Sequence, residues 1–548
     1  MTQRAPVDQE AGEVFGVLEA APGVPAGAQR PGRPAPKWLW VAGLAVLVPV
    51  AVPVVALLFR VLGASESAWD VLFSSRTLEL IIRSALLTGL VTMAATGIGV
   101  GAAWIVVRTD LAGRRLWALG VSLPLVIPSY VLALSFLAAS GPRGLFADLT
   151  GIEIPVLDGL PGAWLALTLS TLPYVFLVVT AALNRLDPSL EEAARGLGAS
   201  RWRVFFTVTL PQLRPAIGAG ALLAALYTLS DFGAVSLMRF DAFTRVIYAQ
   251  YSGRLDRTPA AVLSMVLIIL ALVLIIAEER TRGRGAFYTR RPSRRYEPQH
   301  LSRGGRTVAT VFLATVTAVG VLLPVSVLVV WVARAVSEGD ELRIAWNAVA
   351  GSLVASTLAA LLAMVAAVPV VVLAVRYASR SSAWLERSVY VTFSLPHITV
   401  ALAVLFFAVR YLGPLYQGLL LLVVVYATIF LAQATGAAKS ALLQVNPHLE
   451  DAARGLGRGS LRTIVEITLP LIWRGLLAGG ALVFLTTMKE LPVTLLLRPT
   501  GFDTLAVRIW SAADELFYAR AATSALVLLA VSAIPMYFLV LRQKDSPI

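Results

Sequence analysis

Residues 190–198 read LEEAARGLG and residues 449–457 read LEDAARGLG, which is almost the same string twice. The two copies are separated by close to half of the 548-residue chain. The same offset relates Thr209-Leu210-Pro211 to Thr468-Leu469-Pro470. Each copy is a polar segment of helical character between two long apolar segments. The repeat therefore predicts two tandem halves, each with one polar insert to which a soluble partner can bind.

The composition places these halves in a membrane. Hydrophobic residues make up 58% of the chain, charged residues make up 14%, and the mean hydropathy is +0.78. Soluble proteins average about 45–50% apolar and about 25% charged residues. We therefore predict an all-α polytopic membrane protein, with about twelve transmembrane helices in two tandem homologous six-helix halves.

A helix that spans a bilayer needs roughly 20 mostly apolar residues. Twelve segments meet this requirement, near residues 38–60, 84–107, 116–140, 162–183, 215–237, 259–277, 308–333, 347–375, 388–409, 414–437, 475–497 and 521–541. The predicted organisation is a disordered cytoplasmic tail (1–37), a first transmembrane half (38–279, loop about 185–214), a basic cytoplasmic linker (280–306) and a second transmembrane half (307–548, loop about 442–474).

Lysine and arginine set the predicted orientation. With the N-terminus inside, the inner segments carry roughly twice as many of these residues as the outer ones, as cytoplasmic loops do. Both termini and both inserts are therefore predicted in the cytoplasm. The net charge of +14 and the basic linker fit anionic lipid headgroups better than nucleic acid, so no nucleic-acid partner is expected.

Each insert has the signals of a short helix. Asp187-Pro188 and Asn446-Pro447 are favourable helix starts. Leu190, Ala193, Ala194 and Leu197 then form a narrow apolar stripe, and glycines end the helix. The stripe either packs beneath the chain's own helices or receives another protein. The similarity between the halves is concentrated in the inserts, which suggests a shared external constraint.

The strings EEAARGLGASRWRVFFTVTLP and EDAARGLGRGSLRTIVEITLP resemble the cytoplasmic loop signature of ABC importer permeases. The resemblance implies that each loop forms a coupling helix in a groove of a separate ATPase. One chain would then bind two copies of an ABC ATPase subunit and receive solute from an extracytoplasmic binding protein. The resemblance also implies the cytoplasmic (inner) membrane of a prokaryote. The residues it assigns to ATPase coupling are Glu191, Glu192, Ala193, Ala194, Gly198, Glu450, Asp451, Ala452, Ala453 and Gly457.

The chain lacks a phosphate-binding loop of its own. Such a loop ends in Gly-Lys-Ser/Thr, and none of the four lysines, Lys37, Lys439, Lys489 and Lys544, follows a glycine. There is also no cysteine, which excludes thiolate metal sites and disulfides. We expect a permease subunit that is not an enzyme and holds neither cofactor nor metal, with ATP and Mg on partner subunits.

Four residues near the outer ends of two predicted spans are candidates for the transport pathway: Ser230, Asp231, Lys489 and Glu490. Ionisable groups inside spans are costly and usually face the bundle interior or water. Two carboxylates approaching from opposite halves would suit a hard cation. The structural alternative is that Lys489 pairs with one of the acids, or that a neighbouring helix satisfies Glu490.

The substrate is predicted from resemblance. The run Lys489-Glu490-Leu491-Pro492, followed by Leu497-Arg498-Pro499, is similar to that of ferric iron importers, which implies Fe(III), free or chelated, as cargo. Thiamine importers and aminoethylphosphonate importers share the fused design and stay open. A secondary transporter driven by an ion gradient is a more distant alternative, because duplicated halves occur there too.

Overall fold

The structure is a computed structural model that describes residues 35–63, 66–142, 144–253, 257–281, 298–339 and 344–541. Most of the predicted tail (1–37) and linker (280–306) lies outside these ranges. The described residues are helical and contain no strand; an isolated bridge joins Thr109 to Gln299. The predicted all-α fold class is confirmed.

The helices of the first half are α1 (Lys37–Leu62), α2 (Glu66–Leu72), α3 (Ser75–Arg108), α4 (Arg114–Ser122), η2 (Leu123–Leu125), α5 (Ser129–Ala139), α6 (Leu145–Thr150), α7 (Gly159–Arg185), α8 (Ser189–Gly196), α9 (Arg201–Val204), η3 (Phe205–Thr209), α10 (Leu210–Ser230), α11 (Gly233–Leu237), α12 (Phe243–Gly253) and α13 (Thr258–Thr281).

Those of the second half are α14 (Arg303–Thr317), η4 (Ala318–Leu322), α15 (Leu323–Ser337), α16 (Trp346–Arg376), α17 (Arg380–Ser394), α18 (His397–Tyr411), α19 (Leu419–Gln444), α20 (Pro447–Gly455), α21 (Ser460–Thr463), η5 (Ile464–Thr468), α22 (Leu469–Met488), α23 (Pro492–Leu497), α24 (Leu505–Asp514) and α25 (Tyr518–Leu541). The element η2 is a 3-10 turn, whereas η3, η4 and η5 are π turns.

Two predicted spans are bent rather than straight. In the described part of the chain, ten helices are long and apolar enough to cross a membrane. Two helix pairs meet the same test together, which gives up to twelve spans if each bent pair is one span. The pair over 114–139 bends by 95° and the pair over 380–411 by 106°. Pro128 and Pro396 stand at the bends. Proline lacks a backbone N–H and disfavours helical geometry in the preceding residue, which favours a break of the helix at both positions.

Two other predicted spans, 215–237 and 475–497, are each interrupted near their outer ends. The helix α10 ends at Ser230 and α22 ends at Met488, and a short helix, α11 or α23, follows each break. In the first half, Gly233 lies so close to α5 that an added Cβ would stand 2.8 Å from the Cβ of Tyr130. The helices α11 and α5 therefore approach each other closely directly after the break.

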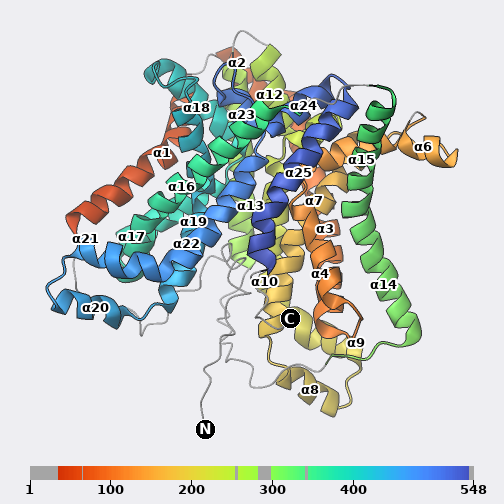
Figure 1. Cartoon of the computed structure of the whole chain (residues 1–548), viewed down its shortest axis with the longest axis horizontal. Coiled ribbons are helices and arrows are strands. Elements are labelled where there is room, and N and C mark those ends of the chain that lie inside the picture. Colours follow the sequence, from red (N-terminus) through yellow and green to blue (C-terminus); the bar gives the residue numbers. More distant parts are fainter. Residues whose placement is uncertain are drawn as a thin grey trace.

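The two halves exchange their first helices. The helix α1 packs against α16, α17 and α18 of the second half. The first span of the second half, Arg303–Ser337, packs against the first half through α14 on α4 and α15 on α5 (Figure 1). Small residues permit these approaches, as in other membrane helix pairs. An added Cβ at Gly43 would meet Leu373 and Leu385, and one at Gly320 would meet Pro124. Neither half is therefore a separate body.

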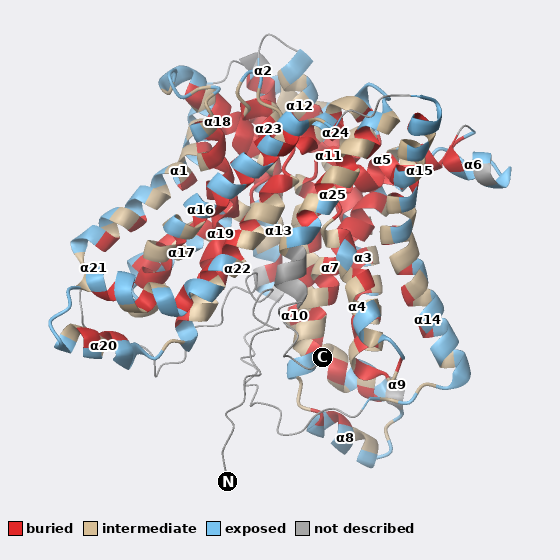
Figure 2. Cartoon of the chain, viewed as in Figure 1, coloured by how far each residue is buried: buried red, intermediate tan, exposed pale blue. Residues whose placement is uncertain are grey.

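Burial follows the expected pattern of a membrane bundle. The buried residues gather in the interior of the bundle, above all on α7 and α19, whereas much of the outward surface of α1 and α14 is exposed (Figure 2). Exposed side chains such as Val48 and Val308 are apolar. Apolar surface that faces outward on helices of this length fits contact with lipid.

Candidate functional site

The two inserts form the short helices α8 and α20, which lie at the same end of the molecule (Figure 1). We call this end the loop side. The Oδ1 of Asp187 accepts a hydrogen bond from the backbone N–H of Ser189 at 3.0 Å, and the Oδ1 of Asn446 accepts one from His448 at 3.0 Å. These bonds satisfy backbone groups at the helix starts.

The two leucines of the apolar stripe on each insert are exposed, whereas Ala194 is half-buried and Ala453 is buried. The side chains of Leu190 and Leu197 are 55% and 90% exposed, and Leu449 and Leu456 are 50% and 84% exposed. After each helix the chain turns through a glycine with positive φ, at +84° for Gly198. The chain's own helices therefore leave these leucines uncovered, and the leucines are available to another protein.

The residues predicted for ATPase coupling fall into an outer and an inner set. Glu192, Ala193, Gly198, Ala452 and Gly457 are exposed, and Ala194 and Asp451 are half-buried. The other three, Glu191, Glu450 and Ala453, are buried. A buried side chain cannot touch a docked protein, so the two glutamates contribute through contacts within this chain.

Glu191 lies in a buried cluster with Arg108 and Thr209. Its Oε1 accepts a hydrogen bond from the Thr209 hydroxyl at 3.0 Å and from Nη2 of Arg108 at 3.3 Å. Arg195 of the same helix adds an ion pair at 3.7 Å. We call Arg108, Glu191 and Thr209 the first anchor cluster; its side chains are nearly inaccessible to solvent.

Glu450 repeats this arrangement in the second half. Its Oε1 accepts from the Thr468 hydroxyl at 3.0 Å, and Nε of Arg376 lies 3.1 and 3.0 Å from its two oxygens. Arg376 also donates to the carbonyl of Val445 at 3.0 Å. We call Arg376, Glu450 and Thr468 the second anchor cluster. Neither Arg108 nor Arg376 is among the site residues predicted from the sequence.

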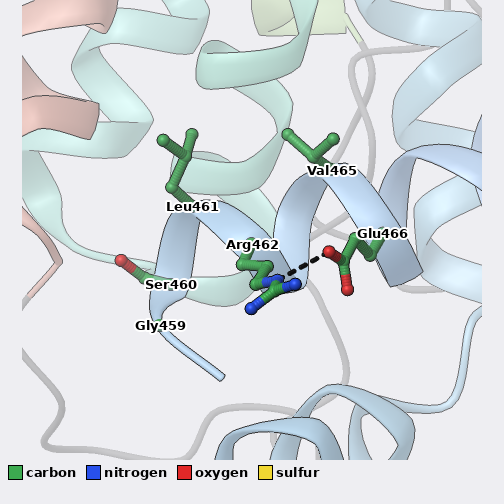
Figure 3. Close-up of a pocket in the computed structure, with 6 residues that line it drawn as sticks. All are labelled: Gly459, Ser460, Leu461, Arg462, Val465 and Glu466. Carbon is green, nitrogen blue, oxygen red and sulfur yellow. Dashed lines mark hydrogen bonds and ion pairs between the residues drawn. The ribbon is translucent and has the colours of Figure 1, made fainter. Parts of the chain in front are cut away.

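A shallow hollow follows the second insert. It has a volume of about 500 Å³ and is lined by Gly459, Ser460, Leu461, Arg462, Val465 and Glu466 (Figure 3). The Nε of Arg462 donates to Glu466 at 2.7 Å. Trp38, at the start of α1, donates to the Ser460 hydroxyl at 3.3 Å. The chain therefore enters its first described helix on the loop side.

Asp231, a predicted pathway residue, is buried at the break between α10 and α11. Its Oδ1 accepts hydrogen bonds from the backbone N–H groups of Ala234 at 2.9 Å and Val235 at 3.3 Å, and its Oδ2 accepts one from the Ser129 hydroxyl. The carboxylate thus satisfies the free N–H groups of α11. Ser230 beside it is half-buried.

Glu490 stands at the equivalent break between α22 and α23. Its Oε1 accepts from the backbone N–H of Val493 at 3.3 Å, and its Oε2 lies 2.9 Å from Nδ1 of His397. Ser129 and His397 each follow the proline at a bend. In both halves, the first residue after the bend therefore contacts the acid at the break, which matches the alternative that a neighbouring helix satisfies Glu490.

Lys489 connects the two halves. Its Nζ donates to the backbone carbonyl of Leu125 at 2.8 Å rather than to either acid, and the Tyr130 hydroxyl lies 3.5 Å from the Lys489 carbonyl. Tyr130 follows Ser129 in sequence and Lys489 precedes Glu490, so these contacts bring the two acid sites into one central region. We call Ser129, Asp231, His397, Lys489 and Glu490 the central polar cluster.

Sequence reasoning missed Ser129 and His397 as members of this cluster. The signal that could have found them is the match of Pro128-Ser129 with Pro396-His397, which has the same offset as Arg108 with Arg376. Among the described residues, no group of three or more His, Cys, Asp or Glu is placed to hold a metal ion. The two acids face backbone N–H groups and neighbouring side chains.

Comparison with known proteins identifies the architecture. The family model for the binding-protein-dependent transport system inner membrane component matches residues 95–277 and again residues 359–544. The chain belongs to this family. The permease is similar to the Fe(3+)-transport system permease protein FbpB 2 of Haemophilus influenzae. The two sequences are 32% identical, and the alignment covers 93% of this chain and 99% of the relative.

Other relatives match only one half of the permease. The molybdenum transport system permease protein ModB of Escherichia coli is 34% identical over 37% of this chain and 91% of its own. A solved bacterial ABC transporter involved in the import of the polysaccharide alginate covers 45% of this chain and 96% of its own, with 18% identity and a TM-score of 0.37. The chain is the multi-pass permease subunit of an ABC importer, and members of this family work with an ATPase and a binding protein.

Proposed function

We propose that this permease imports ferric iron. The observation that carries the proposal is the relative FbpB 2, which is aligned over nearly its full length and shares the two-half layout. The molybdenum and sulfate permeases cover less than half of this chain. The run Lys489-Glu490-Leu491-Pro492 adds the resemblance that first indicated iron.

Uptake of radiolabelled Fe(III) by cells with and without this gene tests the substrate. We expect iron uptake to fall when the gene is removed, and thiamine uptake, measured in parallel, to stay unchanged. Loss of thiamine uptake alone would replace iron by thiamine. If neither changes, growth on aminoethylphosphonate as the phosphorus source tests the remaining fused-permease substrate, and its loss would also overturn the iron proposal.

The exposed leucines of α8 and α20 support docking of two copies of one ABC ATPase subunit, one on each helix. The repeat gives both docking faces the same chemistry, since Leu190, Ala193 and Leu197 have the counterparts Leu449, Ala452 and Leu456. The loop side and both termini then face the cytoplasm of the inner membrane, as the excess of Lys and Arg predicts. ATP and Mg²⁺ are held by the ATPase subunits, and this chain binds no cofactor.

The central polar cluster is the proposed gate. It lies where two bent spans and two interrupted spans meet, and Lys489 bridges the halves there. The binding protein delivers solute at the end opposite the loops, where α12 and α24 lie (Figure 1). Native mass spectrometry of the purified importer tests the assembly: two ATPase copies per permease are expected, and a single copy would contradict it.

A further inference from the structure

The two anchor clusters have a role that docking alone does not explain. Arg108 is the last residue of α3, and Thr209 is the last residue of the π turn that leads into α10. Arg376 and Thr468 hold the same positions at the ends of α16 and η5. Each buried glutamate therefore joins its loop helix to the ends of two spans.

The contacts within each cluster are of a kind that resists displacement. A charged pair that is removed from water interacts strongly, and loss of one partner leaves the other charge buried and unpaired. Glu191 and Glu450 are 2% and 3% exposed, and each is held by an arginine and a threonine from different elements. A loop helix cannot move far without moving the spans or breaking these contacts.

The π turns occupy matching places in the two halves. The turn η3 ends at Thr209 and η5 ends at Thr468, each directly before a Leu-Pro pair. A π turn inserts an extra residue into a helix and often marks a functional position. Here each π turn ends at the threonine whose hydroxyl donates to the buried glutamate.

The exposed and the buried faces of each loop helix carry separate tasks. Leu190 and Leu197 face outward, whereas Glu191 faces the first anchor cluster. A protein docked on the leucines would push or pull the helix, and the buried cluster would receive that movement on the opposite face. The second loop helix has the same division, with Leu449 and Leu456 outside and Glu450 inside.

We propose that the two anchor clusters transmit movement of the docked ATPase subunits into α3, α10, α16 and α22. This inference rests on the proposed docking of ATPase subunits on α8 and α20. It makes Arg108, Thr209, Arg376 and Thr468 positioning residues that touch neither ATP nor solute. The same clusters tie both interrupted spans, and through them the central polar cluster, to the loop side.

The test uses the natural absence of cysteine in this chain, which permits spin labels at chosen positions. One label pair reports the loop helices through Ser189→Cys and His448→Cys, and a second pair reports the spans through Arg76→Cys on α3 and Asn347→Cys on α16. All four positions are exposed. Distances within each pair are measured by pulsed electron resonance in the assembled importer, with and without ATP and vanadate.

The anchor variant is Thr209→Val with Thr468→Val, which removes one hydrogen bond from each glutamate and keeps the ion pairs. The matched control is Thr207→Val, because Thr207 lies in the same π turn and donates to the Arg203 carbonyl instead. We expect ATP to shift both label pairs in the unmodified chain and in the control. In the anchor variant we expect the distance within the loop pair still to shift with ATP, and the shift within the span pair to be smaller. The amount of iron transported per ATP hydrolysed should fall about fivefold or more.

Each other outcome has a defined meaning. If the span pair shifts as far in the anchor variant as in the control, the anchor clusters do not transmit movement and this inference is wrong. If the variant no longer retains the ATPase subunits, the clusters serve docking, and the inference is also overturned. If the unmodified chain binds no ATPase, the proposed docking itself fails. Arg108→Lys with Arg376→Lys gives a second variant, in which a weaker but charged contact is expected to give an intermediate loss.

Discussion

At the scale of single residues, three carboxylates of this permease hold parts of its own backbone in place. Asp231 and Glu490 accept hydrogen bonds from the N–H groups that begin α11 and α23, and Asp110 accepts one from the chain that returns from the linker. An acid in a membrane protein is readily interpreted as a ligand for a cation. The hydrogen bonds show instead that these carboxylate oxygens already accept from groups of this chain.

Substitution of Asp231 distinguishes a role in binding a cation from a role in capping α11. Asparagine keeps an oxygen that can accept from Ala234, so Asp231→Asn should retain most iron uptake. Alanine removes the acceptor and should lower the free energy of unfolding by about 0.5–2 kcal/mol, the usual cost of a lost helix cap. Uptake assays and thermal unfolding in detergent measure the two effects, with Ser230→Ala as the neighbouring control. Complete loss of uptake in Asp231→Asn would favour a direct role with the cargo.

Asp110 lies where the linker meets α3, and its contacts there give a prediction on pH dependence. Its Oδ1 accepts the backbone N–H of Leu301 at 3.0 Å, and its Oδ2 lies 2.8 Å from His300 and 2.7 Å from Arg306. The hydrogen bond from Leu301, followed by those from His300 and Arg306, holds the pKa of Asp110 well below its usual range. The contact is therefore fully formed above the unfolded-state pKa of about 3.9 and weakens only as the pH falls below it.

Hydrogen exchange of the amides of Gln299 and Leu301 checks this prediction. Protection should be the same at neutral and mildly acidic pH, because the Asp110 carboxylate stays ionised across that interval. Asp110→Asn should reduce protection at both, whereas Asp70→Asn on the exposed side of α2 should not. Loss of protection between neutral and mildly acidic pH in the unmodified chain would show that another group controls the contact.

At the scale of elements, short helices carry the functional surfaces while long helices hold them in place. The coupling candidates α8 and α20 have 8 and 9 residues, too few to be stable alone in water. The anchor clusters and the cap at each helix start compensate for this shortness. An exposed apolar stripe on such a small helix is the feature most available for docking.

The stripe can be changed without disturbing the fold. Leu197→Asp together with Leu456→Asp should abolish copurification of the ATPase, because charges replace apolar contacts at both docking faces. Each leucine is at least 84% exposed, so each substitution should change the free energy of unfolding by no more than about 0.5 kcal/mol. Ser189→Asp at the exposed start of α8 is the control for added charge. An ATPase that still copurifies with the double variant would place docking elsewhere.

At the scale of the whole molecule, the halves are related by repetition but joined asymmetrically. Lys489 donates across the interface to Leu125, whereas Ser230 occupies the matching position in the first half. A hydrogen bond from a charged group contributes about 1.5–3 kcal/mol. One lysine therefore holds a sizeable share of the contact between the halves at the centre.

Lys489→Gln should make the importer easier to open. With the bond to Leu125 weakened, ATP hydrolysis in the absence of the binding protein should rise by about tenfold, the factor that corresponds to about 1.4 kcal/mol. Ser230→Ala should leave hydrolysis unchanged. ATPase activity of the reconstituted importer is the measurement, and equal basal rates in Lys489→Gln and the unmodified chain would show that this contact does not restrain opening.

The membrane class, the duplication and the two loop helices could be predicted from sequence because they depend on local properties. Long apolar segments, a repeated string and cap residues such as Asn446 indicate the same local structure whatever the tertiary fold around them. The prolines at 128 and 396 were present in the same sequence, yet they stood in segments apolar enough to predict straight spans. The bends of 95° and 106° became evident only with the helices in place.

Only the tertiary structure decided which partners the charged residues have. Glu191 and Glu192 are neighbours in a repeated motif, but Glu191 faces Arg108 and is buried, whereas Glu192 is exposed. Lys489 contacts a carbonyl that is 364 residues away in sequence. Local pattern cannot specify such pairs, because they depend on how the two halves pack and exchange their first helices. Sequence determined what kind of protein this is, and packing determined what each charge does.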